Sequence, residues 1–184
     1  MKWFKKKEKK VEDEATKAKK ATRGLLIFPH AATVISVEEV LKDEGYEIRV
    51  VSPPPSYRTG CDLSVEIPLS EESVICGILE KIGLAPMDVM PITGKQMEPL
   101  RFIRSKDYGD YLMVRAANMK MTVDKRTKVI VNISGGGCPD VPHIATSMLG
   151  KRLRDAPNPG DVGFSLCAYS LNHAREEIIK MIGD

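Results

Sequence analysis

Short apolar runs alternate with segments of helical periodicity in the first half of the chain. Runs rich in valine, leucine and isoleucine and bounded by proline or glycine predict strands, whereas apolar residues three or four positions apart predict helices. The expected elements, in order, are a strand at 24–28, a helix at 33–43, strands at 46–51 and 63–69, a helix at 70–82 and a short strand at 88–92. The order β-α-β-β-α-β is that of a ferredoxin-like domain.

The second half of the chain has a different pattern. Valine and isoleucine enrichment predicts a strand at 128–133, and a weaker apolar run predicts another at 111–116. A helix is expected from about His143 to Arg154, a further strand at 162–169, and a last helix that Ser170 caps. We therefore expect a small C-terminal β-α-β-α domain, and an α/β protein of the α+β kind overall.

Composition divides the chain into four parts. Residues 1–23 alternate lysine with alanine, threonine and acidic residues and show no sustained apolar face, which predicts a basic arm that is disordered or helical. Residues 24–93 form the expected first domain, residues 94–110 are polar and interrupted by Pro99 like a linker, and residues 111–184 form the second domain. The arm is a candidate contact for a partner protein.

The charge balance limits the partners that we expect. The sequence has 28 basic and 25 acidic residues, a formal charge of +3, and most of the excess lies in the arm. A nucleic-acid surface on the folded part is therefore not expected. No apolar stretch approaches the ~20 residues that span a bilayer, and no secretory signal pattern is present, so we expect a cytoplasmic protein with reduced thiols and no transmembrane segment.

Four cysteines are candidates for chemistry: Cys61, Cys76, Cys138 and Cys167. No two of them have Cys-x-x-Cys spacing, which excludes zinc ribbons and local iron–sulfur ligand runs. Cys76 lies within the apolar pattern of a predicted helix, and we interpret it as a packing residue.

Cys61 follows three prolines and Gly60 in a loop between two predicted strands. Prolines cannot join a β ladder, so the loop places this thiol outside regular structure. Arg58 could stabilise a thiolate there, and the ferredoxin-like order brings His30, at the end of the first strand, to the same edge of the sheet. Cys61 is thus a candidate reactive thiol with His30 and Arg58 in support; the alternative is an idle thiol on a surface loop.

Residues 22–93 resemble the Se/S carrier protein-like family, which also occurs appended to sulfur carriers of the TusA and YedF type. The resemblance rests on the strand Gly24–Phe28, the helix with Glu38, Glu39 and Leu41, the strand Ile48–Val51, and the proline-containing loop that ends in Gly60-Cys61. It implies sulfur or selenium handling at Cys61. Asp62 stands where the family usually has glycine, and a carboxylate beside a thiol raises its pKa.

A glycine-rich loop with a cysteine follows the strand at 128–133. Gly135, Gly136 and Gly137 are contiguous, so the loop is neither a Walker loop nor a Rossmann fingerprint, although its backbone N–H groups could bind an anion. Cys138 stands just before a predicted helix, where a thiolate is stabilised. If Cys138 and Cys167 both follow neighbouring parallel strands, they share a site for one sulfur or metal; the alternative is a tight turn with a packed cysteine.

These observations give three hypotheses. The first is a thiol-based sulfur or selenium carrier, or a maturation protein for a sulfur-containing metal centre. Its cargo would be persulfide sulfur or an iron–sulfur-type centre, and its partner a sulfur donor or acceptor protein. The second is an enzyme whose Gly135–Cys138 loop binds a phosphate ligand, with Cys138 as nucleophile or Asp140 as acid or base. The third is a non-catalytic subunit of a larger assembly.

Overall fold

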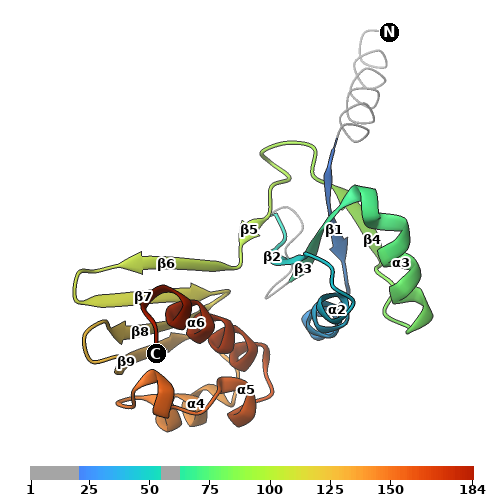
Figure 1. The fold of residues 1–184 in the computed structure, drawn as a ribbon. Helices are drawn as coiled ribbons and strands as arrows, with labels where there is room; N and C mark the ends of the chain where they lie inside the picture. The colour runs from blue at the N-terminus through green and yellow to red at the C-terminus, as the bar shows by residue number, and fades with distance from the viewer. Residues whose placement is uncertain (1–20, 55–62) are drawn as a thin grey trace, which may run out of the picture. The chain divides into compact units, whose positions relative to one another are not determined.

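The computed structural model describes residues 21–54 and 63–184. The chain divides into two compact units between Leu100 and Arg101. Each unit contains one antiparallel sheet with helices, which confirms the predicted α+β class (Figure 1).

A five-stranded sheet with two α-helices forms the described part of the first unit, and its last strand, β5, lies at the boundary with the second unit. Its elements are β1 (Arg23–Ile27), α2 (Ala31–Asp43), β2 (Arg49–Ser52), β3 (Ser64–Pro68), the short helix η2 (Leu69–Glu71), α3 (Glu72–Lys81), β4 (Asp88–Pro91) and β5 (Leu100–Arg101). The strand order is β4-β1-β3-β2-β5, with β1 antiparallel to both β3 and β4, and β2 antiparallel to β3. The first four strands therefore have the predicted ferredoxin-like arrangement.

Glycine ends both α-helices of this unit, as the sequence predicts. Gly45 follows α2 with a φ of +83°, and the next N–H, that of Tyr46, donates to the Leu41 carbonyl at 2.9 Å. Gly83 has a φ of +74° after α3 and permits the same return of the chain. This geometry satisfies carbonyl groups that the helix end would otherwise leave without partners.

The second unit is built on a four-stranded meander. Its elements are β6 (Ile103–Asp107), β7 (Tyr111–Ala116), β8 (Met119–Asp124), β9 (Ile130–Gly135), α4 (Val141–Met148), the short helix η3 (Leu153–Asp155), α5 (Pro159–Val162) and α6 (Leu166–Ile182). The strands pair in chain order, each antiparallel to the next. Buried side chains alternate along β7 and β8, and α6 packs across these two strands.

One strand that the sequence predicts in the second unit is wrong. The strand expected at 162–169 is instead the end of α5, a short connection and the first turn of α6. The apolar residues in that stretch serve the buried face of a helix, where Cys167, Leu171 and Ala174 are spaced three or four positions apart. The segment 94–110, which we expect to be a linker, contains the boundary between the two units as well as β5 and β6. The strand β8, which the sequence pattern does not predict, completes the antiparallel meander.

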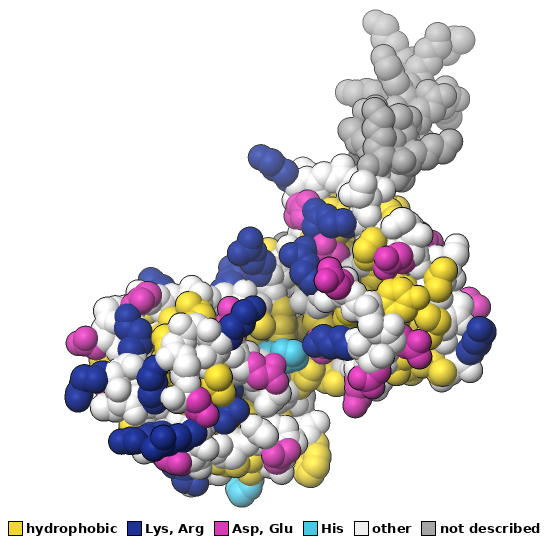
Figure 2. Space-filling view, viewed as in Figure 1, with side chains coloured by type: hydrophobic (Ala, Val, Ile, Leu, Met, Phe, Trp, Pro, Cys, Tyr) yellow, Lys and Arg dark blue, Asp and Glu magenta, His cyan; other side chains and the backbone are white. Residues whose placement is uncertain are grey.

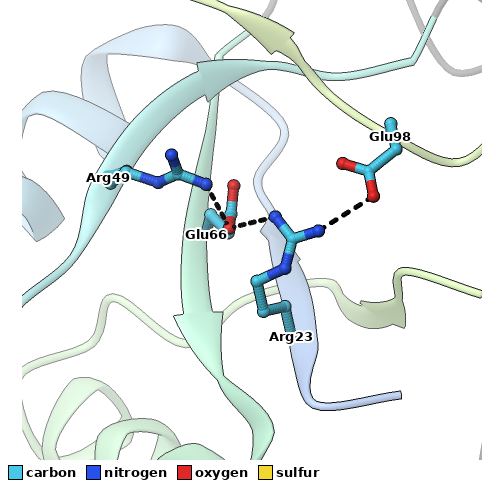
Figure 3. Close-up of polar contacts among 4 residues, drawn as sticks. All are labelled: Arg23, Arg49, Glu66 and Glu98. Atoms are coloured by element: carbon cyan, nitrogen blue, oxygen red, sulfur yellow. Dashed lines mark hydrogen bonds and ion pairs between the residues drawn. The ribbon is translucent and has the colours of Figure 1, made fainter. Parts of the chain in front are cut away.

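A buried carboxylate joins three segments of the first unit (Figure 3). The side chain of Glu66 on β3 is 4% exposed, and its Oε1 accepts hydrogen bonds from Arg23 at 2.8 Å and Arg49 at 2.6 Å. Arg23 also donates to Glu98 at 2.8 Å. Because Arg23 and Arg49 lie on the strands on either side of β3, the two guanidinium groups compensate the buried charge from both neighbours.

Basic and acidic side chains are interspersed over the visible surface of each unit rather than gathered by sign (Figure 2). Among the described residues, no helix combines the length and apolar character that crossing a membrane requires.

Replacing both arginines should destabilise the protein by more than the sum of the single replacements. Either Arg23→Ala or Arg49→Ala leaves Glu66 with one cation and should cost about 1 kcal/mol, because the arginines themselves are partly exposed. The double variant leaves a buried carboxylate without a cation and should cost about 3–5 kcal/mol. Urea denaturation of the four proteins measures this coupling. Adding Glu66→Gln to the double variant should recover most of the loss, and strictly additive losses would contradict the account.

Candidate functional site

The second unit brings Cys138 and Cys167 together. Cys138 lies in the loop between β9 and α4, and Cys167 is the second residue of α6. The two side chains form a hydrogen bond with each other. Cys138 is half-buried, whereas Cys167 is 7% exposed. Cys167 reaches the site from a helix start rather than from a neighbouring parallel strand, and a sulfur or metal shared by the two cysteines stays a prediction.

Backbone groups near the two sulfur atoms also affect their acidity. The backbone of Cys167, in the first turn of α6, lowers the pKa of Cys138. The backbone groups of Gly137 and Cys138 act to lower the pKa of Cys167. The start of a 17-residue helix therefore faces Cys138, and unpaired N–H groups at a helix start carry positive partial charge. The sequence predicts that the helix directly after Cys138, α4, stabilises the Cys138 thiolate. In the structure the helix start near Cys138 is instead that of α6.

The two thiols differ in acidity. Burial raises the pKa of Cys138, but hydrogen bonds from the side chain of Cys167, the side chain of Ser165 and the backbone of Cys167 outweigh it and hold the pKa below that of an ordinary thiol. For Cys167, burial raises the pKa, and its role as donor to Cys138 raises it further. Cys138 is thus the more acidic thiol of the pair, and Cys167 the less acidic one.

Asp140 and Ser165 connect the loop of Cys138 to the helix of Cys167. Asp140 Oδ2 accepts from the N–H groups of Phe164 and Ser165, both at 3.0 Å, and its Oδ1 accepts from the Ser165 hydroxyl at 2.6 Å. Ser165 Oγ in turn accepts from the N–H groups of Cys167 at 3.1 Å and Ala168 at 3.3 Å, which caps α6.

The Ser165 hydroxyl has one proton and two acceptors within reach, the Asp140 carboxylate and the Cys138 sulfur. Its bond to the carboxylate, at 2.6 Å, is short and charge-assisted, so the proton belongs first to Asp140. The donors that sustain the Cys138 thiolate are therefore chiefly those of Cys167. The hydrogen bond with Ser165 also lowers the pKa of Asp140, which keeps this group a carboxylate.

The glycines before Cys138 have packing roles in the site. Gly136 has a φ of +69°, and a Cβ there would lie 2.4 Å from the Met119 sulfur and 2.7 Å from the Cys167 sulfur. Gly135 has a φ of +92°, and its Cβ would lie 2.0 Å from the Asn118 carbonyl oxygen. Only glycine lets the loop approach Cys167 so closely.

The predicted site in the first unit is described only at its edges. Cys61, Arg58 and Asp62 lie outside the described residues. His30 is exposed at the start of α2 and makes no capping hydrogen bond with its side chain. Ile27 pairs with Ser64, so the end of β1 and the start of β3 share an edge, as expected. An interaction between His30 and Cys61 stays a prediction.

Cys76 differs from the paired cysteines. It lies within α3 and is half-buried. Burial raises its pKa, and the carboxylates of Glu72 and Glu80 raise it further. A thiol in these surroundings is a weak nucleophile, in agreement with its interpretation as a packing residue.

Sequence reasoning missed Ser165 and gave Asp140 a different role. Ser165 is the N-cap of α6, and the apolar spacing at 167, 171, 174 and 178 was the signal for a helix that begins there. Asp140 was considered as an acid or base, whereas here it is a fixed acceptor of three hydrogen bonds.

The described residues offer a metal few ligands at this place. Within residues 21–54 and 63–184, no group of three or more histidine, cysteine, aspartate or glutamate side chains lies in a metal-binding arrangement. Structural zinc takes four protein ligands, so the cysteine pair alone would supply half of such a set.

Comparisons with known proteins match both units. Residues 23–91 match the family described as "Putative Se/S carrier protein-like", and residues 102–184 match a "Domain of unknown function (DUF8182)". No solved structure matches the chain. "Uncharacterized protein MJ0011" of Methanocaldococcus jannaschii is 41% identical over 166 residues, which cover 89% of this chain and 83% of that protein. The chain therefore belongs to the family of this archaeal protein, and it joins an Se/S carrier-like domain to a domain of the second family.

Proposed function

We propose that this protein is a thiol-based sulfur or selenium carrier whose Cys138–Cys167 pair accepts a sulfane sulfur and releases it. One observation carries the proposal: Asp140 and Ser165 tie the loop of Cys138 to the helix start that holds Cys167, and hydrogen bonding between the two thiols lowers the pKa of Cys138 and raises that of Cys167. An attacking thiolate beside a protonated second thiol is the arrangement that stepwise sulfur transfer requires. The Se/S carrier-like domain at residues 23–91 supports the same class of function.

In the first step the Cys138 thiolate attacks the outer sulfur of a donor persulfide. The donor's S–S bond breaks, the donor leaves as a thiolate that takes up a proton, and Cys138 becomes a persulfide. In the second step Cys167, after losing its proton, attacks the inner sulfur of Cys138. A Cys138–Cys167 disulfide forms and hydrogen sulfide leaves, so the sulfane sulfur is reduced by two electrons and the two cysteines are oxidised. A dithiol reductant then restores both thiols.

The donor in this scheme is a persulfide on Cys61 of the same chain or on a partner protein. The resemblance of residues 22–93 to Se/S carriers assigns Cys61 the carrying role, and the second unit would then supply the thiols that receive its cargo. Replacing Cys61 separates the two sources, because an external persulfide should still load Cys138 in that variant.

Phosphate binding, the competing hypothesis for the glycine-rich loop, is less well supported. The backbone groups of Gly137 and Cys138, which a phosphate would need, already act on the Cys167 thiol and lower its pKa. Gly135 and Gly136 are accounted for by close packing. The loop therefore serves a sulfur atom on this chain rather than an external oxyanion.

Sulfur loading should depend on Cys138, and its release on Cys167. Anaerobically purified protein treated with cysteine persulfide should release sulfide and form the Cys138–Cys167 disulfide. Cys167→Ser should hold the intermediate as an adduct of about 32 Da on Cys138, because no second thiol attacks it. Peptide-resolved mass spectrometry reads these products, with Cys76→Ser as the control that behaves as wild type. Sulfide release at the wild-type rate by Cys138→Ser would refute the scheme.

The alkylation rate of Cys138 should report the hydrogen bond from Cys167. Only the thiolate reacts, so the rate rises with pH through the pKa of Cys138. Cys167→Ala removes a side-chain donor that lowers this pKa, so its rate profile should move to higher pH and its rate near pH 7 should fall. Cys167→Ser keeps a hydroxyl donor and should stay close to wild type. Peptide-resolved iodoacetamide kinetics measure the profiles, and identical profiles for the two variants would contradict the assignment.

A further inference from the structure

Phe164 is the most exposed large apolar side chain among the described residues, at 99% exposure. It precedes Ser165, the cap of α6, whose hydroxyl lies within reach of the Cys138 sulfur. The ring buries almost none of its surface among the described residues, and its backbone N–H donates to Asp140, which lies two residues from the proposed attacking thiol.

The backbone around Phe164 is fixed on both sides. The Asp140 carboxylate holds the N–H groups of Phe164 and Ser165, both at 3.0 Å. Gly163 is buried, and a Cβ there would lie 2.6 Å from both Asp140 Oδ2 and the Ile144 side chain. The ring is therefore presented by an ordered segment, which reduces the entropy lost when a partner covers it.

The segments around Phe164 expose apolar residues together with the polar side chains of Asp161 and His143. Pro139 and Pro142, on either side of Asp140 in the sequence, are both exposed. The Asp140 carboxylate is occupied by its three hydrogen bonds. Phe164 and the two prolines therefore offer a partner apolar contacts at this place.

We propose that Phe164 is the docking anchor for a partner protein whose reactive cysteine is flanked by apolar side chains. Aromatic residues dominate the binding energy of many interfaces, and burying one ring removes 150–250 Å² of surface from water, so a small sulfur compound could not use this anchor. Cys167 is 7% exposed and Cys138 half-buried, so an incoming sulfur must approach Cys138 closely, and a ring on the segment that Asp140 ties to the Cys138 loop would orient that approach. The inference rests on the proposed function, since it takes Cys138 as the attacking thiol.

The test uses two peptides whose cysteine is a mixed disulfide with thionitrobenzoate, one flanked by leucines and one by serines. The Cys138 thiolate attacks the peptide sulfur, the S–S bond breaks, and coloured thionitrobenzoate leaves; Cys167 then closes the disulfide and frees the peptide thiol. In a Cys61→Ser/Cys76→Ser background, the leucine peptide should react about tenfold faster than the serine peptide. Phe164→Ser should abolish this preference without changing the rate with the mixed disulfide of free cysteine.

Tyr108→Ser is the matched control, because Tyr108 is an exposed aromatic residue of the same unit at the β6–β7 turn, with 53% exposure. It should keep the peptide preference.

Equal rates for the two peptides in the parent protein, or a preference that survives Phe164→Ser, would overturn the docking role. So would sedimentation showing a parent dimer that Phe164→Ser dissociates, because the ring would then bind a second copy. No thionitrobenzoate release from the free-cysteine disulfide would instead refute the proposed thiol chemistry.

Discussion

The carboxylate of Asp140 accepts three hydrogen bonds from the segment that begins α6, and the position of both thiols depends on them. It fixes Ser165, which caps the helix, and the capped first turn presents the backbone and the side chain of Cys167 to Cys138. A helix cap contributes about 1 kcal/mol to stability. Here the contacts of Asp140 and Ser165 also position the groups of Cys167 that lower the pKa of Cys138.

The hydrogen bond from Ser165 lowers the pKa of Asp140, which sets the sign of its pH dependence. A carboxylate whose folded pKa is lowered stabilises the fold above the pKa of an unfolded aspartate, and that contribution is lost as the pH falls through the folded value. The geometry of the thiol pair is therefore coupled to an ionised Asp140, whose negative charge also raises the pKa of Cys138. The donors around Cys138 outweigh this opposing charge.

The two units would contribute different parts of one carrier. The first is a ferredoxin-like sheet whose central carboxylate, Glu66, is compensated by arginines from the strands on both sides. The second presents an ordered pair of thiols of unequal acidity beside an exposed aromatic ring. A carrier needs one thiol that attacks, a second that displaces the cargo, and a surface that selects the protein with which it exchanges. The second unit offers a candidate for each.

The sequence was sufficient for the first unit because its strands and helices end at proline and glycine. Gly45 and Gly83, for example, stop the helices where the pattern predicts. The sequence pattern was less informative for the second unit. The strand β8 alternates buried Met119, Met121 and Val123 with partly exposed residues, but methionine is a weak strand signal. The apolar run before Tyr169 suggested a strand because the decisive interaction, between Ser165 and Asp140, joins residues that are far apart in the sequence.

Disulfide mapping after mild oxidation tests most directly whether Cys138 and Cys167 form one site. Anaerobically purified full-length protein would be exposed to a limiting amount of oxidised glutathione, trapped with acid, and digested for mass spectrometry of its linked peptides. The account predicts that a Cys138–Cys167 disulfide within one chain is the main product, because hydrogen bonding between the two thiols makes Cys138 the more acidic one and places Cys167 next to it. A main product that links Cys138 to Cys76, or that joins two chains, would contradict it.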